Sequence, residues 1–340
     1  MDSPIRVVIE QPSLAKYRVP VFRELANRPG IDLTVLYGEA PGIPNVAPDG
    51  FRAEYVPMRQ WSILGQVIRW HKAQWQAPAR KDVDVVILSW NIRYLSLIPA
   101  LLRARWRGVP VVLWGHGYSK REHGVRKIFR ETITRLATAV LLYDRNTAER
   151  LVESGMPCER IFVAPNAIDQ TLIAQARQAW LDDSQRLEIF LAEHDLCNRP
   201  VLLYVSRFDP NNRVDLLLRA TAELRERFPQ LVTILVGSGE EERERLQELV
   251  DQLQLADHVW FLGSIYEEDL LAPWFLCADA FVYPANIGLS ILHAFGYGLP
   301  VVTCDAIKQQ NPEIVALQHE VNGLLYKEGS LPDLVAAIAR

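Results

Sequence analysis

The sequence has little cysteine and no long apolar run. Its four cysteines, at positions 158, 197, 277 and 304, lie far apart and without metal-ligand spacing. A chain of this length needs no disulfides to fold, so we expect free thiols in a reducing compartment. No apolar stretch is long enough to span a bilayer, and the amino terminus shows no secretion signal because it runs directly into the strand-like residues 5–9. We therefore expect a cytoplasmic protein.

The chain also lacks a strong excess of charge of either sign. Its 37 Lys and Arg residues against 41 Asp and Glu give a formal net charge of −4, so the composition gives no reason to expect a nucleic-acid partner. The apolar fraction of 49% is that of an ordinary globular protein. A chain of 340 residues exceeds what one hydrophobic core usually organises, which predicts two domains.

What the sequence does have is a regular alternation of short apolar runs with longer helical segments, which is typical of a parallel sheet covered by helices. The strands expected in the first half are 6–9, 33–37, 83–89, 109–114, 139–143 and 161–164, and the helices are 19–27, 94–107 and 120–137. The second half starts the pattern again, with strands at 200–205, 232–236, 259–262, 280–283 and 300–304 and helices at 214–228 and 240–253.

This repetition predicts two Rossmann-like α/β domains facing each other across a cleft, where ligands bind in such folds. We place the first domain at residues 1–175, an interdomain segment at 176–197, and the second domain at 198–340. A helical pattern begins at Leu331 and is cut off by the end of the chain, so the second domain is expected to lack its last elements.

Two loops of the second domain could bind an anion. Arg207 lies where the strand 200–205 meets a helix, and a guanidinium beside a helix N-terminus suits a diphosphate. A solvated turn built by Asp209-Pro-Asn-Asn is an equally good interpretation. After the next strand, Gly237 and Gly239 would let the backbone approach a ligand closely, although a tight turn is the commoner use of such glycines.

A third loop leads from the strand 280–283 through Ala285 into a helix. The N–H groups of Gly288, Leu289 and Ser290 would form an anion cradle at the start of that helix. His293 follows one turn later, and the sequence favours ligand contact and an ordinary packed histidine about equally.

In the first domain, His116 lies between two glycines at the end of the strand 109–114, with Tyr-Ser-Lys-Arg following at 118–121. Its place at a strand end favours a functional role over a turn. Asp82-Val-Asp84 spells a motif of metal-dependent glycosyltransferases, but it precedes the apolar run 85–88 and so lies at a strand start. We therefore expect no metal site there.

Taken in order, these segments resemble glycosyltransferase family 4, a group of retaining enzymes with the GT-B fold. The resemblance is carried by Glu159-Arg-Ile-Phe-Val-Ala-Pro-Asn-Ala-Ile-Asp169, the Arg207 loop, Val236-Gly-Ser-Gly239, 259–263, 277–284 and 288–302. The opening at 17–22, Tyr-Arg-Val-Pro-Val-Phe, is similar to a subgroup without the usual glycine pair in the first loop. The chain departs from the family at three polar anchors: Asn212 stands at the usual Lys, with Arg213 beside it, and Ala285 and His293 stand at the paired Glu positions.

The resemblance implies transfer of a sugar from a UDP- or GDP-type donor to a hydroxyl acceptor, with retention and without metal or cofactor, in the synthesis of a polysaccharide or glycoconjugate. The donor would be held by the second domain, through Arg207, Asn212, Arg213, Gly237, Gly239, Tyr266, Ala285, Gly288, Leu289, Ser290 and His293. The first domain would face the acceptor with Lys16, Arg18 and Asn166, and His116 and Arg207 would be the catalytic residues. The alternatives are a catalytically impaired homologue that binds nucleotide or glycan as a partner protein, and a sugar-nucleotide epimerase.

Residues 61–75 suggest a membrane surface. Trp61, Leu64, Ile68 and Trp75 recur at near-helical spacing beside Arg69 and Lys72. Aromatic and basic residues together suit a lipid headgroup interface, so we expect peripheral attachment to an anionic cytoplasmic membrane face. A helix packed on its own sheet is an equally good interpretation.

Overall fold

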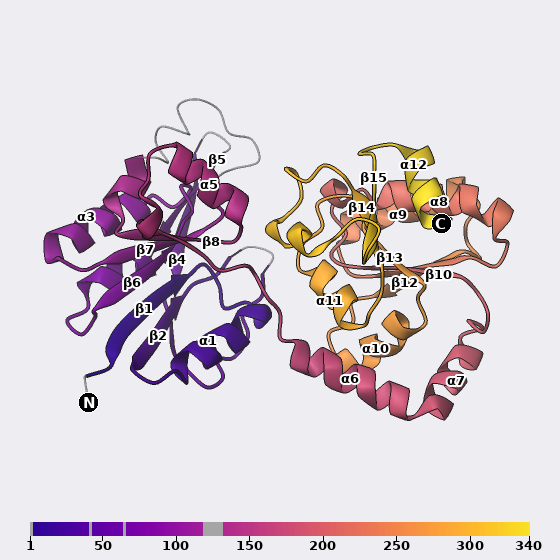
Figure 1. Ribbon diagram of the computed structural model, residues 1–340, viewed down its shortest axis with the longest axis horizontal. Helices are drawn as coiled ribbons and strands as arrows, with labels where there is room; N and C mark the ends of the chain where they lie inside the picture. Colours follow the sequence, from indigo (N-terminus) through magenta and orange to yellow (C-terminus); the bar gives the residue numbers. More distant parts are fainter. Residues whose placement is uncertain (1–2, 41–42, 64–65, 118–131) are drawn as a thin grey trace. The chain divides into compact units, whose positions relative to one another are not determined.

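The computed structural model describes residues 3–40, 43–63, 66–117 and 132–340 (Figure 1). The chain divides into two compact units, Met1–Asn166 and Ala167–Arg340. Each unit contains a parallel β-sheet flanked by helices, which confirms the predicted pair of Rossmann-like α/β domains.

The first unit is built on a seven-stranded parallel sheet in the order β3-β2-β1-β6-β7-β8-β9. Its strands are β1 (Ile5–Gln11), β2 (Ile31–Tyr37), β3 (Arg52–Tyr55), β6 (Val85–Ser89), β7 (Val111–Gly115), β8 (Ala139–Leu142) and β9 (Ile161–Val163). Its helices are the 3₁₀ turn η1 (Lys16–Arg18), α1 (Val19–Ala26), α2 (Lys72–Gln76), α3 (Leu97–Arg107) and α5 (Arg145–Glu153). Of the helix expected at 120–137, residues 118–131 lie outside the described part of the chain, and 132–136 are helical.

The second unit contains a six-stranded parallel sheet in the order β12-β11-β10-β13-β14-β15. Its strands are β10 (Val201–Val205), β11 (Val232–Val236), β12 (Val259–Gly263), β13 (Ala280–Val282), β14 (Val301–Cys304) and β15 (Gly323–Tyr326). Its helices are α6 (Gln170–Asp182), α7 (Ser184–Glu193), α8 (Val214–Arg227), α9 (Glu240–Gln252), α10 (Glu268–Leu276), α11 (Ser290–Gly296) and α12 (Leu331–Ile338).

The core strands are buried on both faces, which explains why they are continuous apolar runs in the sequence. Leu203, Ile234 and Phe281 are fully buried, as are their neighbours along β10 and β11. A parallel sheet covered by helices excludes water from both of its faces, so its strands need no polar alternation. This is the physical reason why these strands could be read directly from the sequence.

The boundary between the units lies earlier than the sequence indicated. Helices α6 and α7 do not form a separate interdomain segment, because α6 packs against α10 and α11 of the second unit. Ile173 and Trp180 of α6 belong to the core of that unit, and the Trp180 indole donates to the backbone oxygen of Asp269. The second unit therefore begins at Ala167 rather than after residue 175.

The helical interpretation of residues 61–75 is wrong. Residues 58–63 and 66–71 form two paired antiparallel strands, β4 (Met58–Ile63) and β5 (Gln66–His71), in which Trp61 pairs with Ile68, and the short helix α2 follows. Residues seven apart can share a helix face or pair across a hairpin, so the spacing alone did not distinguish the two. Leu64 lies outside the described residues.

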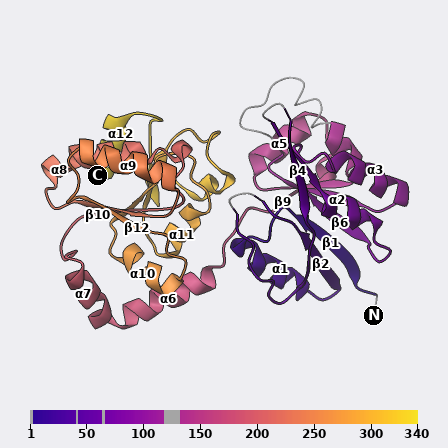
Figure 2. The ribbon, with the colours of Figure 1, turned by 180° about the vertical axis from the view of Figure 1, so that it is seen from behind.

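Helices α2 and α3 of the first unit pack against each other (Figure 2). No Asp or Glu occurs at residues 55–81 or 85–117. Trp106 on α3 is 85% exposed, Leu102 is exposed one turn before it, and Leu95 and Trp75 are exposed as well. The Arg103 guanidinium lies 4.2 Å from the centre of a Trp75 ring, which links α3 to α2.

In the described part of the chain, we find no helix that is both long and apolar enough to cross a membrane.

Candidate functional site

The strand order of the second unit places two of the candidate loops side by side. From β10 the chain continues to β11 on one side, and from β13 it continues to β14 on the other. In open α/β sheets, ligands bind at the carboxyl ends of two neighbouring strands whose connections run to opposite sides, a position called the switch point. The loops that leave these strands contain Arg207 and the segment from Ala285 to Ser290.

Asn212 holds these two loops together. Its side-chain amide donates to the Tyr204 hydroxyl and to the Arg207 carbonyl, each at 3.0 Å, and its Oδ1 accepts from the Asn286 amide at 3.2 Å. The backbone oxygen of Asn212 accepts from the Ala285 N–H at 3.2 Å. Asn212 is only 5% exposed, so its side chain bonds within the protein, and its contact to a donor stays a prediction.

The backbone beneath Arg207 is fixed, whereas its side chain is exposed. The Arg207 carbonyl accepts from Tyr204 and Asn212, and the Tyr283 hydroxyl donates to Ser206 Oγ at 3.1 Å. Burial raises the pKa of Tyr204 and of Tyr283, so both phenols stay protonated and keep donating at neutral pH. The loop is therefore a firm base for an exposed cation at the switch point.

Arg213 is bound to Asp215. Its Nε and Nη2 donate to the two carboxylate oxygens at 2.9 and 3.1 Å, and this pairing raises the pKa of Arg213. The pair carries no net charge, and Arg213 has a left-handed backbone at the start of α8. The geometry thus weighs against the expected compensation for Asn212 by Arg213.

Gly237 and Gly239 are needed where two loops of the same unit cross. A Cβ on Gly237 would lie 1.8 Å from the Ser206 carbonyl oxygen, and one on Gly239 would lie 2.5 Å from that of Phe208. Gly239 also has φ +135°, which L side chains rarely adopt. Both glycines are therefore required by the close approach of the Arg207 loop, whatever binds beside them.

The start of α11 is tied to the end of β10. Ser290 Oγ donates to the Val205 carbonyl at 3.0 Å, and the Asn311 amide donates to the Asn286 carbonyl at 2.9 Å. The first N–H groups of a helix have no partner within the helix, and here they belong to Gly288, Leu289 and Ser290 beside the Arg207 loop. The predicted cradle is thus brought next to the predicted cation.

His293 is paired with an acid that the sequence analysis missed. Its Nε2 lies 2.8 Å from Glu268 Oε1, and the Tyr297 hydroxyl donates to the same oxygen at 2.6 Å. Phe275 stacks on the imidazole at 4.7 Å. The sequence marked Glu268 only as an acidic residue at the start of the helix after β12. The predicted donor residue Tyr266 lies two residues before Glu268 and is 73% exposed. One ring nitrogen of His293 is therefore already occupied, which leaves Nδ1 for the predicted contact to a donor.

In the first unit the strand order also parts between β1 and β6, and η1 follows β1 directly. Lys16 is exposed on this turn, whereas Arg18 is 7% exposed. Arg18 Nη2 donates to the Tyr143 hydroxyl at 2.7 Å, and its guanidinium carbon lies 4.3 Å from the centre of a Trp114 ring.

His116 belongs to the same group of side chains. It follows β7, and its ring centre lies 4.8 Å from that of Tyr143, which itself follows β8. Arg18 and His116, far apart in the sequence, therefore share one tyrosine at the carboxyl edge of the sheet. Asn166 is half-buried after β9, as the last residue of the unit. Residues 118–121 of the His116 motif lie outside the described residues.

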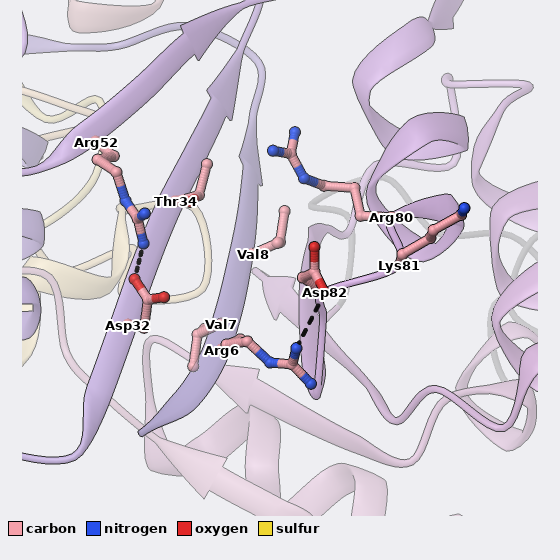
Figure 3. A pocket seen from close by; sticks show the side chains of 9 residues that line it. All are labelled: Arg6, Val7, Val8, Asp32, Thr34, Arg52, Arg80, Lys81 and Asp82. Carbon is pink, nitrogen blue, oxygen red and sulfur yellow. Dashed lines mark hydrogen bonds and ion pairs between the residues drawn. The ribbon is translucent and has the colours of Figure 1, made fainter. Parts of the chain in front are cut away.

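A pocket of about 360 Å³ lies at the opposite, amino-terminal edge of the first sheet (Figure 3). It is lined by the starts of β1, β2 and β3, and two of its basic residues pair with acids that also line it: Arg6 with Asp82, and Arg52 with Asp32. Asp84, just before β6, accepts from the backbone and side chain of Arg6. The two carboxylates of Asp82-Val-Asp84 thus lie at the strand start, as predicted. In the described part of the chain, no cluster of three or more His, Cys, Asp or Glu residues could hold a metal ion.

Two family models match the chain, one on each unit. The model described as Glycosyltransferase Family 4 matches residues 21–172, and the model described as Glycosyl transferases group 1 matches residues 199–340.

Sequence relatives carry the same activity in their names. The GDP-mannose-dependent alpha-(1-6)-phosphatidylinositol monomannoside mannosyltransferase of Mycolicibacterium smegmatis is 28% identical over 65% of this chain and 58% of its own length. This chain therefore spans less than two thirds of that relative. The D-inositol 3-phosphate glycosyltransferase of Geodermatophilus obscurus is 27% identical over 95% of this chain and 76% of its own length.

The fold has a solved counterpart. The crystal structure of Anabaena Alr3699/HepE in complex with UDP superposes with a TM-score of 0.71 at 17% identity, covering 98% of this chain and 89% of that one. At this identity the likeness concerns the fold, and it confirms the expected GT-B architecture.

Proposed function

Because the chain belongs to the glycosyl transferases group 1 of glycosyltransferase family 4, we propose that it transfers a sugar from a nucleoside diphosphate sugar to a hydroxyl acceptor. The observation that carries the proposal is the switch point of the second unit. An exposed Arg207 on a fixed backbone and the first N–H groups of α11 lie together at the ends of β10 and β13. Cations and oriented N–H groups are what a diphosphate requires.

The chemical task is the departure of a diphosphate from the anomeric carbon, which leaves an oxocarbenium-like sugar. Donors that are already in place where negative charge develops stabilise that transition state most. We assign this role to Arg207 and to the N–H groups at Gly288–Ser290. We further propose that the reaction retains configuration and needs no metal, since Arg207 supplies the charge and the only Asp-x-Asp motif of the described chain, Asp82 to Asp84, is paired with Arg6 at the amino-terminal edge of the first sheet.

The donor nucleotide is UDP or GDP in this proposal. The support comes from the named relatives, one of which is GDP-mannose-dependent and one of which was solved with UDP. The acceptor belongs to the first unit, at Lys16, Arg18, His116 and Asn166, and the product is a polysaccharide, glycolipid or other glycoconjugate.

A thermal-shift screen against UDP, GDP, ADP and their sugar conjugates tests the donor assignment. A ligand that binds only the folded protein raises the melting temperature by mass action, so one base should stabilise the protein clearly more than the others. If no nucleoside diphosphate stabilises the protein at millimolar concentration, the proposal is wrong. Binding without product over a panel of acceptors would favour the impaired homologue, an alternative supported by Asn212, Ala285 and His293 at three family anchors. Conversion of the donor without acceptor would favour an epimerase.

We also propose that the protein acts on the cytoplasmic side of a membrane, attached peripherally to anionic lipid. The support is that residues 55–81 and 85–117 contain no Asp or Glu, while Trp106, Leu102 and Trp75 within these ranges are exposed. Exposed tryptophans and basic residues favour a headgroup interface. Flotation with anionic and neutral liposomes tests this: we expect comigration with the anionic liposomes only, lost at high salt.

A further inference from the structure

The most unusual charge in the described part of the first unit is that of Arg18. Its side chain is 7% exposed, its guanidinium donates to a single protein oxygen, that of the Tyr143 hydroxyl, and no described carboxylate contacts it. Its Nε is buried without an acceptor. A buried cation is costly unless it is paired, and arginine is almost never buried without a partner.

Aromatic rings replace the missing carboxylate in part. The guanidinium carbon of Arg18 lies 4.3 Å from the centre of a Trp114 ring and 5.4 Å from that of Tyr143. These aromatic rings hold the Arg18 side chain in place and attract its charge, but they do not accept strong hydrogen bonds from the guanidinium N–H groups. The indole Nε1 of Trp114 is also buried without an acceptor. Two donors on stacked groups therefore lack acceptors at the carboxyl edge of the sheet.

Two acids at the carboxyl edge of the described sheet, Glu10 and Asp144, are committed elsewhere. Glu10, at the end of β1, is fully buried and accepts from the backbone and hydroxyl of Ser89 and from Gln74. Asp144, next to Tyr143, caps α5 by accepting from the backbone and hydroxyl of Thr147. Neither carboxylate can turn to Arg18 without breaking these bonds.

Two further basic side chains belong to the cluster. Lys16 is exposed two residues before Arg18, and His116 packs on the same Tyr143 ring. All of these residues follow β1, β7 or β8 at the carboxyl edge, where open α/β sheets bind ligands. The cluster therefore has the location, charge and hydrogen-bonding capacity of an anion site.

We propose that Arg18 anchors an anionic group of the acceptor, a phosphate or a carboxylate, so that the enzyme glycosylates an acidic acceptor and discriminates against neutral alcohols. The assignment to the acceptor rests on the proposed function, in which the donor diphosphate occupies the Arg207 loop of the second unit. Trp114 and Tyr143 hold the fork in place before the ligand arrives, which lowers the ordering cost of binding. The exposed Lys16 adds a second positive charge that attracts the anionic acceptor.

The binding test uses inorganic phosphate and calorimetry at constant ionic strength. All proteins carry Arg207→Ala, which weakens phosphate binding by the second unit. The parent Arg207→Ala protein is compared with the double variant Arg207→Ala/Arg18→Met. We expect the Arg18 variant to bind phosphate at least tenfold more weakly, because a charge-assisted contact is lost. The matched control is Arg207→Ala/Arg23→Met, since Arg23 lies in the same unit and pairs with Asp49; it should bind like its parent. Equal affinity in all three proteins would overturn the proposal.

Arg18→Lys covers the case in which the methionine variant folds poorly. It keeps the charge and loses the fork, so phosphate affinity should lie between that of the parent and that of the methionine variant. In the unmodified protein, matched alcohols with and without a phosphate monoester provide a test that needs no variant. We expect kcat/KM to be at least tenfold higher for the phosphorylated member, and a preference for neutral alcohols would refute the proposal.

The source of the anion is decided by nucleotide binding. In our assignment, Arg18→Met leaves the affinity for the nucleoside diphosphate unchanged and weakens only the acceptor. A tenfold loss of nucleotide affinity in Arg18→Met would instead assign the anion to the donor and refute the acceptor role. Failure of the proposed function has a separate signature, which is that the unmodified protein binds no nucleoside diphosphate at all.

Discussion

Three residues of the second unit stand where the family has charged anchors, and the structure shows what one of them does. Asn212 bonds Tyr204, the Arg207 carbonyl and Asn286 at once. A flexible lysine could not make all of these contacts, because an ammonium group donates but does not accept. Asn212 therefore fixes the loop where the family has a mobile cation, and in the proposed function Arg207 is the charged side chain that binds the phosphates.

Replacing Arg207 with Ala should weaken binding of the preferred nucleoside diphosphate roughly ten- to hundredfold, since a charge-assisted phosphate contact is worth about 1.5–3 kcal/mol. Arg207 is exposed, so the variant should fold normally. Calorimetry on the purified proteins measures the effect. Arg213→Ala is the matched control, and it should change affinity little because Arg213 is already paired with Asp215. Unchanged affinity in Arg207→Ala would remove the main support for the location of the donor.

The Arg6–Asp84 pair gives a pH-dependent contribution to stability. Hydrogen bonds from the Arg6 side chain and backbone lower the pKa of Asp84 from 3.8 to about 2. A carboxyl whose pKa falls on folding stabilises the protein above its unfolded pKa, and the contribution is lost as the pH drops through the folded value. Asp84→Asn should therefore be less stable than the parent protein at pH 7, and the difference should shrink between about pH 4 and pH 2. Urea unfolding across this range measures it; an equal gap at pH 7 and pH 2 would contradict the assignment.

At the scale of elements, the buried strands could be predicted and the exposed ones could not. The apolar runs of β10, β11 and β14 are buried on both sides and have no competing interpretation. β3 is short and largely exposed, and the β4–β5 hairpin has a spacing that also suits a helix, so neither stands out in the sequence. The loops at the strand ends were predicted for the same reason as the strands that precede them.

The contacts between those loops could not be predicted. Asn212 meets Asn286, and His293 meets Glu268, only because the strand order brings separate crossover connections to one edge. Nothing in the local sequence marks Glu268 or Tyr204 as a partner. Arg18 could be proposed as an acceptor residue from its position, but only the folded chain shows that none of the described carboxylates contacts it.

The hydrogen bonds of Asn212 should hold the Arg207 loop and the loop at 285–290 rigidly together. Asn212→Ala removes two donors and one acceptor at a site that is 5% exposed, and buried groups left unpaired typically cost about 1–3 kcal/mol. We expect the free energy of unfolding to fall by that amount in urea denaturation. We also expect nucleotide affinity to fall, because the Arg207 backbone loses a support. The matched control is Asn211→Ala, whose side chain is exposed and bonds only Asp209; a loss as large in that variant would contradict the network.

At the scale of the whole molecule, charge is distributed unevenly although the net charge is only −4. The first unit has no acidic residue at 55–81 or 85–117, whereas α9 of the second unit begins with three glutamates. Such asymmetry has little effect on folding and a large effect on which surface meets an anionic partner. It therefore identifies the flank bearing α2 and α3 as the face that an anionic membrane would attract.

The double variant Trp106→Ser/Leu102→Ser should reduce binding to anionic liposomes without changing nucleotide affinity. The two side chains lie one turn apart on α3 and are exposed, so their loss should leave the core intact while removing apolar area that would enter the headgroup layer. Replacing Arg105 and Arg107 with Gln should lower binding in a salt-dependent way, since each basic residue near an anionic surface is worth about 1 kcal/mol. Ile189→Ser/Val321→Ser also removes two exposed apolar side chains, from the second unit, and serves as the control. Flotation at low and high salt measures all three. If the control floats as poorly as the α3 variant, or if neither α3 change affects flotation, this flank is not the membrane-facing surface.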